Sequence, residues 1–289
     1  MIDCELDLER AARLAEQAAY AAGTHLLASR ARLAETLVTR HDPAQVAATI
    51  AVEATALIRG VIQRGFAQHD FCGGTEASPW RPGRPCWLVA ALDGAADYLR
   101  GSYRYAVTLA LVFDGEPLLG VVYDPQRNEF FGALSGRGAV CNAAPIRCDD
   151  QPAARPARLA AALPRSNSPA MARCIAEIGR VAIGLGSVHR SVCGALDMAH
   201  LAAGRIDGLW AHDPDSHSAA AGIALLRESG ACLQARDALP LLESRSIFAS
   251  RPEFAPRLAA LLDAPAVAAP ARSALAASGH ARESTRALG

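Results

Sequence analysis

The sequence predicts a layered α/β or α+β fold in two lobes, and three observations predict it. The chain has 289 residues, 51% of them hydrophobic and 20% charged, which is enough for one large domain or two fused lobes with a core. Apolar residues recur at helical spacing near the N-terminus, and the pattern changes to strands at Trp87. Strand and helix patterns then alternate to about residue 262, as in layered folds.

Two helices are predicted before the first strand. Residues 6–36 and 44–64 each carry an apolar stripe at helical spacing. Residues 70–85 are rich in Gly and Pro, which predicts a loop. Strands are then predicted over 87–89, 105–112, 118–123 and 129–133. The pair Asp114-Gly115 between two apolar runs predicts a hairpin.

The second half follows a polar, Pro-containing stretch at 149–156. It is predicted to contain helices at 190–203 and 217–228, with short strands at 181–186 and 231–234. We therefore expect an N-terminal α+β lobe and a C-terminal α/β lobe, followed by a disordered tail without periodicity. Their boundaries are 1–150, 151–263 and 264–289.

Charge and composition exclude several classes of function. The 29 basic and 29 acidic side chains cancel, which argues against nucleic acid or a membrane surface as a partner. Every basic residue is arginine, so Schiff-base chemistry and the phosphate-binding lysine of P-loops are excluded. No apolar run approaches the roughly 20 residues of a membrane span, and the acidic N-terminus does not resemble a signal peptide. A cytoplasmic location is expected.

The eight cysteines are scattered and form no C-x-x-C motif. In a reducing compartment this pattern predicts free thiols that serve mostly as small buried residues. The spacing does not favour a structural zinc site.

Two long motifs carry a family resemblance. From Trp87 the chain reads WLVAALDGAADYLRG, then AVTLALVFDGEPLLGVVYDP and GRGAVCN. From Arg190 it reads RSVCGALDMAHLAAGRIDGLW, then HSAAAGIALLRESGACL. Both resemble the inositol monophosphatase family of magnesium-dependent, lithium-sensitive phosphatases, with a weaker likeness from about residue 8 to 262. The resemblance implies an α+β fold built as a layered αβαβα sandwich, and a homodimer.

The differences from the family fall on its metal ligands, which are a Glu of G-E-E, both Asp of D-P-L-D-G-T and the Asp of W-D. The positions that differ are Gly74 and Thr75 in the G-E-E loop, Ala90 for the first Asp, and Ser218 for the Asp of W-D. Ala95 replaces the Thr that helps to activate water, and Glu76 is displaced. Only Asp93 remains as a matched ligand. The sequence therefore predicts a degenerate metal site. Because Mg²⁺ prefers six oxygen ligands, binding of the family's cofactor is doubtful here.

Two features of the pocket remain as candidates. Gly94-Ala95-Ala96 follows a strand and is expected to open a short helix, where backbone N–H groups can bind phosphate; the alternative is an empty turn. Cys193 lies near the start of the helix at 190–203. A helix N-terminus lowers the pKa of a thiol, which would make Cys193 a nucleophile. The alternative is a small residue in place of the family's Ser.

The segment from His212 to His217 is the most polar of the second half. On an extended chain, alternation would place Asp213, Asp215 and His217 on one side. Such a set could form a replacement metal site for zinc or manganese; the alternative is a solvated loop. Further acidic residues that could add ligands are Asp97 and Glu76.

The resemblance also implies substrate-pocket positions, namely Cys193, Gly194, Ala211 and Ser218. Three functional hypotheses follow. The chain is a non-catalytic or weakly active protein that binds a small phosphorylated or polyol molecule and acts as a regulatory or partner subunit. Alternatively, it is a metal-dependent phosphoric monoester hydrolase with relocated ligands. The third hypothesis is a metal-free reaction that uses Asp93, Cys193 or His217.

Overall fold

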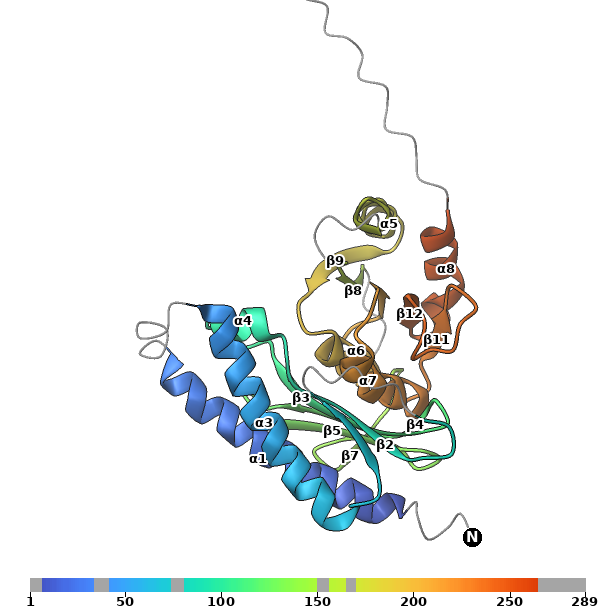
Figure 1. The fold of residues 1–289 in the computed structure, drawn as a ribbon. Coiled ribbons are helices and arrows are strands. Elements are labelled where there is room, and N and C mark those ends of the chain that lie inside the picture. Colours follow the sequence, from blue (N-terminus) through green and yellow to red (C-terminus); the bar gives the residue numbers. More distant parts are fainter. Residues whose placement is uncertain (1–6, 34–41, 74–80, 150–155, 165–169, 265–289) are drawn as a thin grey trace, which may run out of the picture.

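Seven strands from the first half of the chain form one sheet, in chain order, in this computed structural model (Figure 1). The structure describes residues 7–33, 42–73, 81–149, 156–164 and 170–264. The strands are β1 (Asp70–Gly73), β2 (Cys86–Asp93), β3 (Ala106–Phe113), β4 (Glu116–Asp124), β5 (Glu129–Leu134), β6 (Gly138–Cys141) and β7 (Ala144–Ile146). Strand β1 runs parallel to β2, and every other neighbouring pair is antiparallel.

Five strands from the second half form another sheet, in the order β11-β12-β10-β8-β9. They are β8 (Ala157–Ala162), β9 (Gly186–Ser191), β10 (Gly208–His212), β11 (Cys232–Ala235) and β12 (Ser246–Ser250). The helices are α1 (Leu8–Ala31), α3 (Pro43–Gly65), α4 (Ala95–Leu99), α5 (Ala170–Gly184), α6 (Gly194–Ala202), α7 (Ser216–Glu228) and α8 (Ala255–Asp263), with the 3₁₀ turn η1 (Pro252–Phe254).

The elements stack in five layers (Figure 1). Helices α1 and α3 cover one face of the first sheet, and α6 and α7 lie between the two sheets. Helices α5 and α8 cover the outer face of the second sheet. This arrangement confirms the predicted layered αβαβα sandwich.

Helices α1 and α3 are explained by their N-capping residues and by their apolar faces. Asp7 caps α1 by accepting a hydrogen bond from the Arg10 amide at 2.9 Å, and Asp42 caps α3 just before Pro43. The buried face of α1 consists mainly of alanines, which let α3 and the sheet approach closely. Both predicted helices are confirmed, with ends that differ from the expected ones by a few residues.

The expectation that no apolar run approaches a membrane span is wrong for α3. By length and composition alone, Pro43–Gly65 could cross a membrane. In the structure its apolar face, including Ile50 and Ile58, is buried against α1 and the first sheet, while the exposed Glu53 lies beside that face and contacts His25 of α1. Helix α3 is therefore explained as a core helix of the sandwich.

Two predictions of local structure are wrong, and one is confirmed. Residues 70–73 form the edge strand β1 instead of the start of a loop, because pairing with β2 decides the conformation there. Residues 181–184 belong to α5, since a short apolar run fits a helix as well as a strand. The hairpin at Asp114-Gly115 is confirmed, with φ of 50° and 80° at the two residues.

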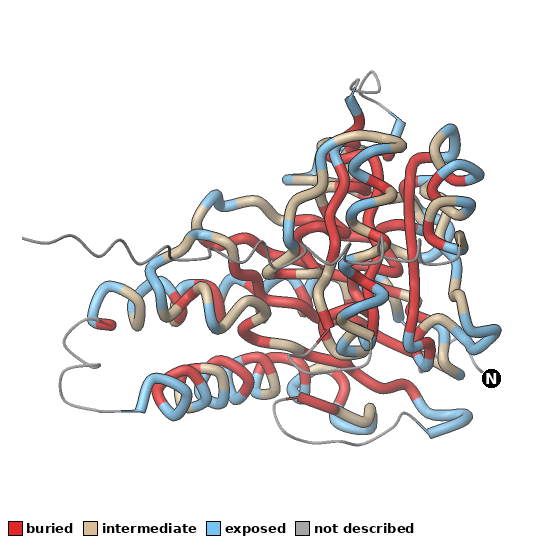
Figure 2. The backbone as a smooth tube through the Cα atoms, turned by 90° about the horizontal axis from the view of Figure 1, so that it is seen from above, coloured by how far each residue is buried: buried red, intermediate tan, exposed pale blue. Residues whose placement is uncertain are grey.

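Burial is greatest along the middle of the molecule (Figure 2). Helix α7 is buried from Ser218 to Leu226 without interruption, because it has a sheet on either side. The predicted disordered tail lies outside the described residues beyond Ala264, as do Gly74, Thr75 and Glu76.

Candidate functional site

Asp93 ends β2 and leads into the turn that starts α4. Gly94 has a φ of +86°, and a Cβ there would lie 2.5 Å from the Arg104 carbonyl oxygen. The turn therefore requires glycine. The carbonyl of Gly94 accepts hydrogen bonds from the amides of Asp97 and Tyr98, which closes the first turn of α4. The predicted short helix after Asp93 is confirmed.

The Asp93 carboxylate is held by groups of α6. Its Oδ2 accepts hydrogen bonds from Cys193 Sγ at 3.0 Å and from the Ala195 amide at 3.1 Å. These contacts join the end of β2 to the start of α6 and bring together residues that lie 100 positions apart in the sequence. One oxygen of the single family-matched carboxylate is thus bonded within the protein.

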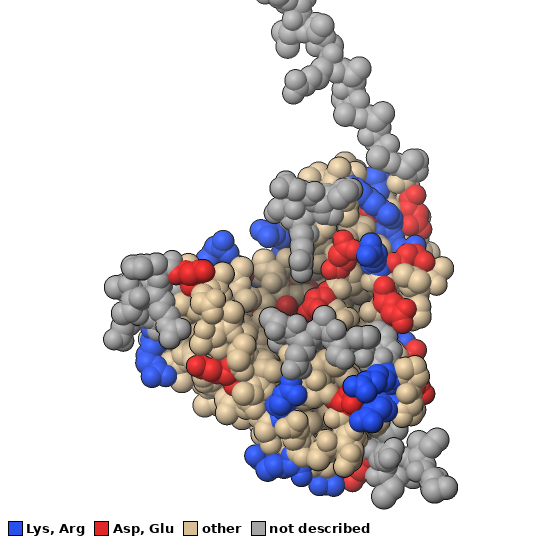
Figure 3. Space-filling view, in the orientation of Figure 1, with Lys and Arg blue, Asp and Glu red and all other residues tan. Residues whose placement is uncertain are grey.

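The pKa of Asp93 reflects its burial and the charges near it. Burial raises the pKa of Asp93, and the charges of Asp215 and Asp197 raise it further, while the bonds from Cys193 and Ala195 act in the opposite direction. Figure 3 shows a hollow near the centre of one face of the molecule with acidic side chains in it.

Cys193 lies at the N-cap of α6 and is fully buried. Burial raises the pKa of this thiol well above its usual range, and the neighbouring Asp93 raises it further. The predicted lowering by the helix N-terminus is outweighed, so the group is a protonated donor near neutral pH. His189, which could have activated it, instead contacts Asp197 Oδ1 through Nε2 at 3.1 Å. The geometry gives no support for a nucleophilic thiolate.

The polar segment after β10 does not continue as an extended chain. Asp213 has a φ of +49°, its amide donates to the Arg245 carbonyl at 2.7 Å, and its side chain is exposed. Asp215 is the N-cap of α7, and its Oδ1 lies 3.3 Å from His217 Nδ1. The expected alternation of Asp213, Asp215 and His217 is wrong, because the strand ends at His212.

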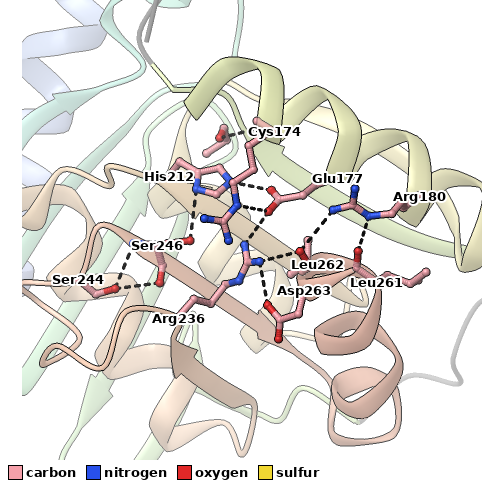
Figure 4. A network of polar contacts seen from close by, with 12 residues as sticks. Cys174, Glu177, Arg180, His212, Arg236, Ser244, Ser246, Leu261, Leu262 and Asp263 are labelled. Atoms are coloured by element: carbon pink, nitrogen blue, oxygen red, sulfur yellow. Dashed lines mark hydrogen bonds and ion pairs between the residues drawn. The ribbon is translucent and has the colours of Figure 1, made fainter. Parts of the chain in front are cut away.

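His212 points away from this segment, into the network in Figure 4. Its Nε2 lies 2.6 Å from Oε2 of Glu177 on α5, and its Nδ1 lies 3.3 Å from Ser246 Oγ. Cys174 is nearby, and in the described part of the chain Cys174, Glu177 and His212 are the only three metal-ligating side chains with ligand atoms within 4.8 Å of one another. The sequence prediction missed this group because it did not place a helix over 170–180.

The donor set of this group does not fit a metal ion. Glu177 Oε1 also contacts Arg236 Nη1 at 2.8 Å and Arg173 Nε at 3.1 Å. Burial opposes ionisation of Glu177, but the hydrogen bonds from His212 and Arg236 lower its pKa to about 2. Two guanidinium groups beside the carboxylate would repel a cation. We therefore interpret the group as a buried ion-pair network that joins α5 to the second sheet.

The positions that correspond to the missing ligands serve the protein itself. The Ala90 carbonyl accepts a hydrogen bond from Thr108 Oγ1 at 3.3 Å, and Ser218 Oγ donates to the Asp215 carbonyl at 3.2 Å. Ala211 is buried within the second sheet, between β8 and β12. Gly194 is the first residue of α6, and Asp97 lies half-buried on α4. Among the described residues at the ligand positions that the resemblance implies, only Asp93 is a carboxylate, and its Oδ2 is bonded within the protein.

A second concavity lies elsewhere. It has a volume of about 950 Å³ and is lined by the start of α1, the end of α3 and the turn between β5 and β6. None of the predicted site residues that the structure describes lines it. Its charged lining includes Arg10, Arg84 and Arg137 together with Asp7 and Glu9, so no single ligand charge is favoured.

Comparisons with known proteins agree on one family. Residues 7–265 match the family model described as "Inositol monophosphatase family". The chain is 32% identical to the Nus factor SuhB of Xylella fastidiosa over 74% of this chain and 78% of that protein. It is 28% identical to an inositol-1-monophosphatase of Rhizobium meliloti over 74% and 81% of the two chains. The solved inositol monophosphatase of Anabaena superposes with a TM-score of 0.75, at 26% identity, over 90% of this chain and 98% of that one.

Proposed function

The chain belongs to the inositol monophosphatase family, and we propose that it has little or no metal-dependent phosphatase activity. Its cleft would instead bind a small phosphorylated or polyol molecule, and the protein would act as a regulatory or partner subunit. One of its relatives is named a Nus factor and another an inositol-1-monophosphatase, so names in this family do not all refer to a phosphatase.

The observation that carries the proposal is the bonding of Asp93. Its Oδ2 is held by Cys193 Sγ and the Ala195 amide, and the matched neighbouring positions are Ala90 and Ser218. A divalent cation supplies a Lewis acid and a source of hydroxide, each worth several kcal/mol of the barrier. Without ligands to hold the cation, we expect both contributions to be lost.

The remaining groups of the proposed site suit ligand binding. The amides of Ala95 and Ala96 lie in the first turn of α4, where helical N–H groups have no carbonyl acceptor within the helix. They are the proposed donors to an anion. The carboxylates of Asp93 and Asp215 would accept hydrogen bonds from hydroxyl groups, so a polyol is the complementary neutral part.

Restoration of the missing ligands tests the proposal. The wild-type protein, with Mg²⁺ and either inositol 1-phosphate or small sugar phosphates, is expected to release no phosphate above background. The triple variant Ala90→Asp, Ala95→Thr and Ser218→Asp returns three of the family residues near Asp93, with the G-E-E loop left unchanged, and is expected to release phosphate measurably. Adding Asp93→Asn to that variant is the matched control and should abolish the gain. Mg²⁺-dependent release by the wild-type protein that is lost in Asp93→Asn would contradict the proposal.

The alternative of relocated ligands has one observation in its favour, the effect of the Asp215 charge on Asp93. Calorimetry on the EDTA-treated protein separates the two hypotheses. Micromolar binding of Mg²⁺, Mn²⁺ or Zn²⁺ that strengthens with inorganic phosphate and is lost in Asp215→Asn would support relocation. Phosphate binding without metal binding would support the non-catalytic cleft.

A further inference from the structure

Strands β1 and β2 bring two cysteine sulfur atoms into contact. Cys72 Sγ lies 3.3 Å from Cys86 Sγ. In the parallel register Cys72 is opposite Leu88, and Cys86 is opposite Asp70, so the two cysteines are diagonal neighbours on one face of the sheet. Both are buried, in the core between the two sheets. Neither cysteine is among the predicted site residues.

The surroundings suit a bond between the two sulfurs better than a shared metal ion. In the part of the chain that the structure describes, no third metal-ligating side chain joins this pair within 4.8 Å. A disulfide has an S–S distance of about 2.05 Å, so the sulfurs need to approach by roughly 1.3 Å. Among the described strands, β1 has four residues and pairs with β2 alone, at the edge of the sheet. Short edge strands open locally more readily than central ones, which gives both the movement and the access that oxidation requires.

We propose that Cys72 and Cys86 form a reversible disulfide when the protein meets a hydroperoxide such as hydrogen peroxide. The sulfur of Cys72 attacks one peroxide oxygen, the O–O bond breaks, and the products are a sulfenic acid and water. The sulfur of Cys86 then attacks the Cys72 sulfur, the S–O bond breaks, and a second water leaves with the Cys86 proton. The two thiols lose two electrons in total, and the peroxide gains them. Exchange with a dithiol reverses the bond.

The order of the two steps follows from position. Cys72 lies on the edge strand and meets the oxidant first when β1 opens. Burial raises the pKa of Cys86, and its contact with Cys72 raises it further, so Cys86 remains a thiol until the sulfenic acid forms beside it. The disulfide would fasten the edge strand to β2, the strand that ends at Asp93. The inference does not depend on the proposed function.

The sequence allows a direct test by mass spectrometry. Arg81 and Arg84 are both followed by proline, so trypsin leaves residues 65–100 as one peptide whose only cysteines are Cys72 and Cys86. The full-length protein is treated with hydrogen peroxide, denatured, alkylated and digested. We expect this peptide to be two hydrogens lighter and to carry no alkyl group, and we expect dithiothreitol before alkylation to restore two alkyl groups.

Matched variants identify the partners. Cys148→Ala removes another buried cysteine and should leave the result unchanged, whereas Cys86→Ala should leave Cys72 as a higher oxide or a mixed disulfide. Thiol titration of the oxidised wild-type protein should show the eight thiols reduced by two. The inference is wrong if the 65–100 peptide keeps two alkyl groups while the partly exposed Cys141 and Cys232 become oxidised.

Discussion

The thiol of Cys193 donates a hydrogen bond of 3.0 Å to Oδ2 of Asp93, and this contact links the first sheet to the helix layer between the sheets. The donor is fully buried, and the acceptor is the single family-matched ligand position that keeps its carboxylate. A residue that the resemblance places in the substrate pocket thus helps to hold the fold together. The contribution of this hydrogen bond to the free energy of unfolding can be measured with variants of Cys193.

Removing the donor should destabilise the protein more than removing a similar thiol elsewhere. Cys193→Ala leaves Asp93 without one of its two donors, and we expect a loss of about 1–3 kcal/mol in the free energy of unfolding. Cys193→Ser keeps a donor and should lose less. Urea denaturation measures both, with Cys148→Ala as the control for loss of a buried sulfur. Equal losses in Cys193→Ala and Cys148→Ala would mean that the hydrogen bond contributes nothing.

His200 should make the protein sensitive to acid. Burial lowers its pKa to about 4, and the charge of Arg205 acts in the same direction. The unfolded chain binds a proton near pH 6.5 whereas the folded one does not, so stability is lost as the pH falls from 6.5 towards 4. The loss reaches about 3 kcal/mol at the lower end of this window.

Unfolding by urea at pH 7 and pH 4.5 measures this effect. His200→Gln should lose clearly less stability between the two pH values than the wild-type protein. His25→Gln changes a partly exposed histidine on α1 and serves as the control. A pH dependence that is the same in wild type and His200→Gln would show that other groups cause it.

The ion-pair network of Glu177 should contribute strongly to stability at neutral pH. Glu177→Gln leaves the buried guanidinium of Arg236 with the exposed Asp263 as its remaining ion-pair partner among the described residues, and we expect a loss of roughly 3–5 kcal/mol. Because the folded-state pKa of Glu177 is about 2, its contribution is present above pH 4.5 and is lost as the pH falls towards 2.

The control for this variant is Glu116→Gln, which removes an exposed ion pair with Arg227. Its loss should stay below about 1 kcal/mol. Denaturation of both variants at neutral pH provides the comparison. If Glu177→Gln costs no more than Glu116→Gln, the network in Figure 4 is not a stabilising element.

Metal removal should leave the thermal stability unchanged. A ligand that binds only the folded state raises the unfolding temperature, so a protein without a bound cation gains nothing from one. We expect the same unfolding temperature in EDTA and in millimolar Mg²⁺. The same measurement is made with Zn²⁺, because Cys174, Glu177 and His212 are the side chains that could ligate it. A rise with Mg²⁺ that is absent in Asp93→Asn would show that a cation does bind near Asp93.

Sequence reasoning predicted the elements whose pattern is local. Helices α1 and α3 and the hairpin at Asp114 were accessible because periodicity and turn residues act within a few positions. Strand β1 was not predicted, because it depends on pairing with β2. Helix α5 was missed because the apolar run at its end, 181–184, fits a helix as well as a strand. The lobe boundaries, the cytoplasmic location and the homodimer remain predictions.

The candidate site was predicted only as a set of residues. The motifs placed Asp93 and Cys193 in one pocket, but the hydrogen bond between them depends on how α6 packs against the end of β2. The contact of His212 with Glu177 spans 35 positions and depends on helix α5, which was not predicted although apolar residues recur at helical spacing over 170–184. An acidic residue on the apolar face of a helix is the signal that could have pointed to Glu177.

The burial of α7 on both sides has a consequence for how the molecule comes apart. Each sheet uses the same helix to complete its interior, so neither sheet keeps a full interior when the other is lost. We therefore expect the two halves of the chain to melt together in one cooperative transition, although they form separate sheets. An N-terminal fragment that ends between β7 and β8 would lack α7. The apolar face of the first sheet that α7 covers would then be exposed, and we expect this fragment to aggregate instead of folding alone.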